Sequence, residues 1–110
     1  MWVAANSSLA DDGAILSERY FGWFGGYVLP VRPAEPLTEQ QAKARRSYHI
    51  GYYRGDQLMR VEKYLDGALF FRQEYEYAAN GKLARHVVSN ADGVTHVGRF
   101  DENGKYHPDQ

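Results

Sequence analysis

Regularly spaced turn signals divide the second half of this chain and constrain its fold more than any other feature. Glycines beside an Asp or Asn recur at intervals of 12, 14, 12 and 11 residues, at Gly55, Gly67, Gly81, Gly93 and Gly104. Such an interval accommodates one strand and one turn. The runs between these glycines are rich in Tyr, Phe and Val, which favour strands. The spacing therefore predicts an antiparallel β-meander.

The same turns predict how the strands pair. Four of them place Asp or Asn directly before Gly, which is typical of a three-residue loop with a left-handed glycine; a two-residue primed turn is the alternative. The pairs expected from three-residue loops are Tyr64 with Ala68, Ala78 with Lys82, and Asn90 with Val94. Because side chains alternate along a strand, this pairing also assigns each residue to a face of the sheet.

The assigned faces differ in character, as expected for a sheet with one buried side. The predicted apolar face holds Met59, Val61, Leu69, Phe71, Tyr75, Tyr77, Leu83, Val87 and Val97. The predicted polar face holds Arg60, Glu62, Arg72, Glu74, Glu76, His86 and His96.

The first half of the chain has a different organisation. Residues 1–15 are small and polar and are expected to be a flexible tail, followed by a single domain over residues 16–110. Aromatic residues broken by glycines predict one or two short strands over residues 18–31, and Pro30, Pro33 and Pro36 predict an extended connector. Thr38 and Gln41 have the spacing of a capping box, so we expect one short helix near residues 38–46. The predicted fold class is β-rich α+β, with five to seven antiparallel strands and one helix.

Composition excludes several classes of protein. A length of 110 residues with 44% apolar residues suits one packed domain. The formal charge of −1 provides no field that attracts nucleic acid or anionic membranes, so neither is expected as a partner. The absence of cysteine excludes disulfides and favours a cytoplasmic location. No segment approaches the roughly 18 apolar residues of a membrane span, and the first residues lack the pattern of a secretion signal.

Residues 75–83, together with the turns at Gly93 and Gly104, resemble the tyrosine-rich YD repeats of Rhs proteins and the MORN-like repeats of small bacterial proteins. The resemblance covers roughly the last third of the chain. The Tyr-Asp pair of the family is missing, because Ala78 follows Tyr77. The resemblance implies a self-adhering β-sheet that serves as a scaffold, a shell or an interaction surface, and it supplies no catalytic residue.

One group of side chains has the composition of a chemical site. The predicted register puts Glu74 opposite His86, with His96 diagonal to His86 on the same face. Two imidazoles and a carboxylate suit a divalent metal or an acid–base pair. No HExxH motif, serine elbow or phosphate loop accompanies them. We therefore favour a solvated face at this position and predict no catalytic residue, no metal site and no cofactor.

The charged side chains of the polar face have two interpretations. Arg60, Glu62, Arg72, Glu74 and Glu76 form either a docking strip or a set of cross-strand ion pairs. Interleaved charges on the wet face of a sheet are routinely cross-strand pairs. We favour that second interpretation.

Aromatic residues give the strongest functional signal. Nine Tyr, five Phe and two Trp are more than one face of a thin sheet readily hides, so an exposed aromatic surface and a core closed by the helix are equally supported. The leading hypothesis is a non-enzymatic module that binds a protein or peptide partner, for example an immunity or antitoxin-like protein. The candidate surface comprises Trp23, Phe24, Tyr27, Arg60, Arg72, Glu74, His86 and His96.

Two alternatives remain. One is a small β-cavity protein that binds an apolar ligand or performs acid–base chemistry with Glu74 and His86. The other is a structural, self-assembling unit, for which a homo-oligomer is expected.

Overall fold

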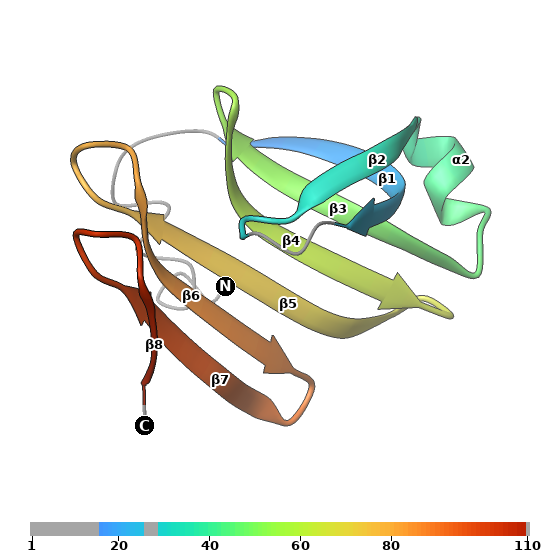
Figure 1. The fold of residues 1–110 in the computed structure, drawn as a ribbon. Helices are drawn as coiled ribbons and strands as arrows, with labels where there is room; N and C mark the ends of the chain where they lie inside the picture. The colour runs from blue at the N-terminus through green and yellow to red at the C-terminus, as the bar shows by residue number, and fades with distance from the viewer. Residues whose placement is uncertain (1–15, 26–28, 110) are drawn as a thin grey trace.

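The computed structural model of this chain describes residues 16–25 and 29–109, and these residues form one antiparallel sheet with one short helix (Figure 1). Eight strands lie in the order β2-β1-β3-β4-β5-β6-β7-β8. The strands are β1 (Ser17–Gly25), β2 (Arg32–Leu37), β3 (Ser47–Arg54), β4 (Gln57–Leu65), β5 (Ala68–Tyr77), β6 (Leu83–Asn90), β7 (Gly93–Phe100) and β8 (Tyr106–Asp109). The β-rich class is confirmed, whereas five to seven strands was an underestimate. The predicted tail over residues 1–15 lies outside the described residues.

The proline-rich segment accounts for part of the underestimate. The expected connector is strand β2, in which Pro36 lies opposite Phe21 and Pro33 opposite Phe24 of β1. Strand β2 is at the edge of the sheet and pairs with β1 alone. Proline is tolerated there because an edge strand uses the backbone N–H groups of only one side in the ladder.

The short helix is α2 (Glu39–Lys43), and its predicted capping box is confirmed. Thr38 Oγ1 accepts a hydrogen bond from the Gln41 amide at 3.0 Å, and Gln41 Oε1 accepts one from the Thr38 amide at 2.9 Å. The helix ends at Lys43, three residues earlier than the predicted end at residue 46. Among the described residues, no helix is long and apolar enough to cross a membrane.

The hairpin turns take both of the forms considered. The β5–β6 loop has three residues, with the Ala78 amide donating to the Lys82 carbonyl at 2.8 Å, so the predicted Ala78–Lys82 pair is confirmed. The β4–β5 and β6–β7 turns have two residues, since Leu65 pairs with Ala68 and Asn90 with Gly93. The predicted pairs of Tyr64 with Ala68 and Asn90 with Val94 are therefore wrong.

A β-bulge beside the β5–β6 turn reverses the two faces of the strands that follow it. Tyr77 pairs with Leu83 and Glu76 with Arg85, which leaves Ala84 as the extra residue. An extra residue exchanges the two faces because side chains alternate with a period of two. His86 and His96 therefore lie on the face of Tyr75, which is the opposite of the prediction. Their neighbours Val87 and Val97 lie on the charged face, which is again the reverse of what was expected.

Each face of the sheet carries its own hydrophobic cluster. The first consists of Val31, Tyr53, Leu58, Val61 and Tyr75, with Phe21, Phe24, Leu29, Tyr77 and Leu83 packed against it. The second consists of Ala42, Tyr48 and Ile50, with Tyr20, Leu37, Tyr52 and Tyr64 around them. Figure 1 shows α2 beside β1 and β2, where Ala42 closes this second cluster. The helix thus covers one face, and residues 29–31 cover part of the other.

Candidate functional site

Two adjoining hollows lie on the face of the sheet that carries Tyr75. The larger has a volume of about 710 Å³ and is lined mainly by Leu29, Pro30, Tyr77, Leu83, Phe100 and Tyr106. The smaller, about 540 Å³, is lined by residues 29–33 together with Tyr53, Asp56, Gln57, Leu58, Tyr77 and Gly81. Because they share Leu29, Pro30, Tyr77 and Gly81, the two hollows form one elongated depression. We call it the aromatic groove.

Hydrogen bonds and ring contacts hold the walls of the aromatic groove in place. The Tyr77 hydroxyl donates to the Leu58 carbonyl, which ties β5 to β4 beneath the groove. The Val31 amide donates to the Tyr75 hydroxyl at 3.3 Å, which fixes residues 29–31 over the sheet. At the far end the rings of Phe100 and Tyr106 lie 5.1 Å apart between their centroids. The lining is therefore built from side chains that are already positioned.

Gly98 makes room for one of these walls. The Tyr106 ring lies so close to Gly98 that a Cβ atom at this position would overlap the ring. A side chain at residue 98 would therefore displace Tyr106 from the groove. The sequence analysis did not select Tyr106, although its position two residues after the Gly104 turn was an available signal.

A buried polar cluster lies on the same face. The Tyr75 hydroxyl donates to Gln73 Oε1 at 2.7 Å, and His86 Nε2 lies 2.9 Å from the same oxygen. The His86 ring stacks on Tyr75 at 5.1 Å between centroids. Burial, followed by the charge of His96, lowers the pKa of His86. Since an amide oxygen can only accept, a neutral His86 donates from Nε2 and serves to lock Tyr75 and Gln73 together.

The predicted constellation of Glu74, His86 and His96 is not assembled. His86 and His96 do lie near each other, with ring centroids 6.4 Å apart, and His96 hydrogen-bonds to the Tyr106 hydroxyl. Glu74, however, pairs with Val87 on the opposite face because of the bulge at Ala84. Within the described residues no three His, Cys, Asp or Glu side chains come together as metal ligands.

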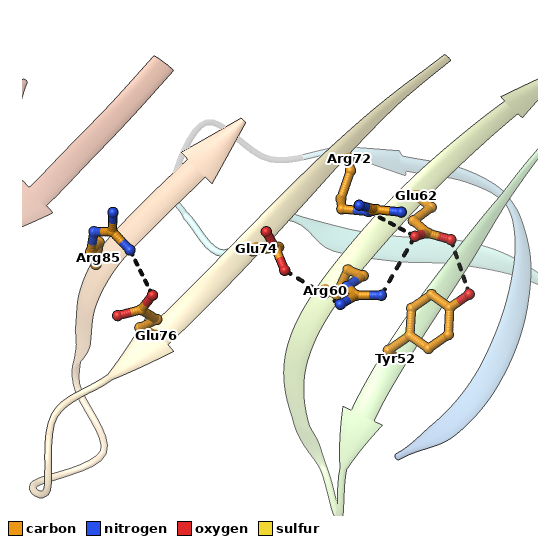
Figure 2. A network of polar contacts seen from close by, with 7 residues as sticks. All are labelled: Tyr52, Arg60, Glu62, Arg72, Glu74, Glu76 and Arg85. Carbon is orange, nitrogen blue, oxygen red and sulfur yellow. Dashed lines mark hydrogen bonds and ion pairs between the residues drawn. The ribbon is translucent and has the colours of Figure 1, made fainter. Parts of the chain in front are cut away.

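The opposite face carries a network that we call the charged ladder, formed by Tyr52, Arg60, Glu62, Arg72, Glu74, Glu76 and Arg85 (Figure 2). At its centre the side chain of Glu62 is only 3% exposed. Its Oε1 accepts from the hydroxyls of Tyr52 and Tyr64, both at 2.9 Å, and its Oε2 accepts from Arg72 Nε at 2.8 Å. The Glu62 carboxylate is thus saturated by side chains of its own strand β4 and of the neighbouring strands β3 and β5.

The arginines of the charged ladder are paired in the same way. Arg60, with a side chain 8% exposed, lies 3.7 Å from Glu62 and 3.4 Å from Glu74. Arg85 lies 2.7 Å from Glu76, and this outer pair is exposed. The charged side chains therefore bond chiefly to one another across the strands.

The tyrosine donors at Glu62 stay protonated. Burial, and then the charge of Glu62, raises the pKa of Tyr64 to about 12, so its hydroxyl remains a hydrogen-bond donor.

The remaining candidates from the sequence do not join these groups. Trp23 is 58% exposed and its indole lies against Gly25, apart from the aromatic groove. Phe24 packs edge-on against His49 at 4.4 Å and Phe71 at 6.2 Å, inside the first cluster. Tyr27 lies outside the described residues. The seven candidate residues that the structure describes are accordingly divided between two faces and the core.

A family match accounts for most of the chain. Residues 14–109 match the profile of a protein family described as a family of unknown function, DUF6156. The chain belongs to this family. The resemblance to YD repeats and MORN-like repeats is therefore wrong, because the DUF6156 match spans that region and neither repeat family matches. A search of curated proteins found no match, and a search of solved structures found none.

Buried histidines make the stability of this DUF6156 chain sensitive to acid. Burial, and then the charge of Lys63, lowers the pKa of His49 from 6.5 to about 4. Between pH 6.5 and about pH 4 the imidazole of residue 49 is protonated in the unfolded chain but neutral in the folded chain. The free energy of unfolding therefore falls as the pH decreases, by up to roughly 3 kcal/mol from His49 alone.

Urea denaturation of the wild type and of His49→Phe at several pH values between 7 and 4 measures this effect. Phenylalanine keeps a ring against Phe24 but does not titrate, so the variant should lose less stability over this range than the wild type. Parallel pH profiles for the two proteins would contradict the assignment.

Proposed function

We propose that this chain is a non-enzymatic interaction module whose aromatic groove binds an extended apolar segment of a protein or peptide partner. The observation that carries the proposal is the groove itself, which combines hollows of about 710 and 540 Å³ into one elongated aromatic depression. Aromatic side chains supply large contact areas at interfaces because few of their torsions must be ordered. An immunity protein that covers a toxin is one form of such a module.

The edges of the sheet support side-chain docking rather than strand addition. Strand β2 at one edge contains Pro33 and Pro36, and β8 at the other contains Pro108. Proline lacks the N–H that an added strand would need, and it is a common protection of exposed edges. A partner therefore engages the face of the sheet.

The chemistry of the groove supports binding over catalysis. Among the described lining residues, Asp56 is the one carboxylate and histidine is absent. An apolar small molecule is the second candidate occupant, because about 710 Å³ lies within the range of roughly 300–1,000 Å³ for ligand pockets. Acid–base chemistry by Glu74 and His86 has no support, since these residues lie on opposite faces.

Selection of peptides from a random displayed library against the purified chain tests the proposal. We expect enrichment of sequences with spaced aromatic or aliphatic residues. Phe100→Ala, at the rim of the aromatic groove, should weaken binding of a selected peptide at least tenfold, because it removes a large apolar contact. Trp23→Ala is the matched control, as it removes an exposed aromatic residue that does not line the groove, and it should leave the affinity unchanged. Failure to enrich any peptide, or equal losses in both variants, would contradict the proposal.

A further inference from the structure

Most cations of this chain already have partners, and the exceptions gather at the aromatic groove. The chain has thirteen Lys and Arg residues. Eight of them form an ion pair or a ring contact through the side chain, and Arg54 and Arg99 are engaged as well. The remaining three are Arg32, Lys82 and Lys105, whose side chains have no ion pair or hydrogen bond within the described part of the chain.

These three unpaired cations lie at both hollows of the groove. Arg32, at the start of β2, lines the smaller hollow, and Lys82, directly before β6, lines the larger one. Lys105 lies between Gly104 and Tyr106, both of which line the larger hollow. All three cations are exposed to solvent. Their positive charges are therefore accessible to a partner in the groove.

The groove also differs in charge from the chain as a whole. Asp56, the one carboxylate among the described lining residues, lies 3.9 Å from Arg19 and is thereby offset. The lining is consequently cationic, although the chain has a formal charge of −1. Charges on a binding surface are matched by opposite charges on the partner. An acidic partner is therefore favoured over a neutral or basic one.

The distribution of the two lining cations favours a peptide over other anions. Arg32 lines only the smaller hollow and Lys82 only the larger, and the apolar residues Leu29, Pro30 and Tyr77 are shared by both. A ligand with one carboxylate could meet only one of these cations at a time, whereas an extended peptide offers carboxylates before and after its apolar residues. A nucleic acid carries a phosphate at every nucleotide and needs a basic track along its backbone, which two separated cations do not provide.

We propose that the partner segment bound in the aromatic groove is an acidic peptide, with apolar side chains in the hollows and Asp or Glu residues paired with Arg32 and Lys82. This inference rests on the proposed function, because it concerns the same groove. Apolar contacts supply most of the affinity, while the carboxylates determine which apolar segments are accepted. Because both cations are exposed, salt screens this selection.

Peptide selection against the wild-type chain and against Lys82→Glu tests the inference. The wild type should enrich peptides with Asp or Glu beside their apolar residues, and Lys82→Glu should enrich peptides with Lys or Arg there. One acidic peptide from the wild-type selection should bind about three- to tenfold more weakly to Lys82→Glu and to Arg32→Glu, and Lys82→Gln should show a smaller loss. Raising the NaCl concentration from about 50 mM to about 500 mM should also weaken its binding to the wild type.

Arg46→Glu is the matched control, because it changes the net charge by the same amount. The Arg46 side chain is 77% exposed and pairs with Asp66, which directly follows the end of β4 remote from Gln57. This variant should change the affinity by less than about twofold, since exposed charges beyond a Debye length are largely screened.

The outcomes separate the inference from the proposed function. Selected peptides that are neutral or basic, or an acidic peptide with the same affinity for the wild type and both groove variants, overturn the inference while the proposed function stands. Equal losses in Arg46→Glu and Lys82→Glu overturn it as well, because net charge alone then explains the effect. Tighter binding of a poly-dT oligonucleotide than of the selected peptide would assign the cations to nucleic acid and likewise overturn it. If neither selection enriches any peptide, the proposed function falls and the inference falls with it.

Discussion

Replacing Glu62 with Gln is expected to lower the free energy of unfolding by about 3–5 kcal/mol, which is the usual cost of breaking a buried ion pair from one side. The side chain of Glu62 is 3% exposed and accepts from Tyr52, Tyr64 and Arg72. In the variant the buried guanidinium of Arg60 keeps its charge and loses a compensating carboxylate. Equilibrium urea denaturation followed by circular dichroism measures the loss.

A second glutamate of the same charged ladder provides the control. Glu76 pairs with Arg85 at 2.7 Å, but both side chains are largely exposed. Glu76→Gln should therefore change the free energy of unfolding by no more than about 1 kcal/mol. Similar small losses in both variants would show that Glu62 is hydrated and that the ladder does not hold the strands together.

Replacing Tyr75 with Ala is expected to have an effect of the same size, about 3–5 kcal/mol, because it empties a large site in the first cluster. Tyr75 is 1% exposed, and its ring stacks on His86. The conservative variant Tyr75→Phe keeps the ring but removes the hydroxyl that links Gln73 and Val31. It should cost about 1–3 kcal/mol, since the buried Val31 amide loses its partner.

The two Tyr75 variants also differ in their consequences for the aromatic groove. Loss of the hydroxyl frees residues 29–31, so Tyr75→Phe should weaken binding of a selected peptide more than its stability loss alone suggests. Thermal unfolding and peptide affinity are measured on the same samples. A stable Tyr75→Phe with unaltered peptide affinity would contradict a role of this hydrogen bond in shaping the groove.

The sequence predicted the parts of the fold that depend on local chemistry. Turn dipeptides identified the hairpins from β3 to β8, and the spacing of Thr38 and Gln41 identified the helix. The charged side chains of β4 and β5 were assigned to one face correctly. The two-residue turn and the register shift between Lys63 and Tyr64 each displace the pairing by one residue, so the pairs from Arg60 to Lys63 differ from the predicted ones by two residues. A shift of two residues preserves the faces of a sheet.

The predicted faces of β6 and β7 were wrong because of the bulge at Ala84, and the reason is again local. Strand β6 contains Val87 and Val88 in succession, so either register buries a valine, and the hydrophobic pattern does not reveal the bulge. Because the bulge exchanges the two faces of β6, His86 lies opposite Tyr75 and not opposite Glu74. The aromatic groove could not be predicted either, since it depends on residues 29–31 folding across strands that follow them in the sequence. The proline-rich segment was interpreted as a connector because each proline fixes its own φ and disfavours helix at the residue before it, whereas residues 32–37 in fact pair with β1 as an edge strand.

Mapping the bound peptide on the protein tests the central claim most directly. Titration of a selected peptide into the isotope-labelled full chain, followed by amide ¹H–¹⁵N correlation spectra, reports which residues change their surroundings. We expect the largest shifts at Tyr77, Leu83, Phe100 and Tyr106, with little change at Arg60 and Arg72 on the opposite face. Shifts that concentrate on the charged ladder or around Trp23, with the groove residues unaffected, would contradict the account.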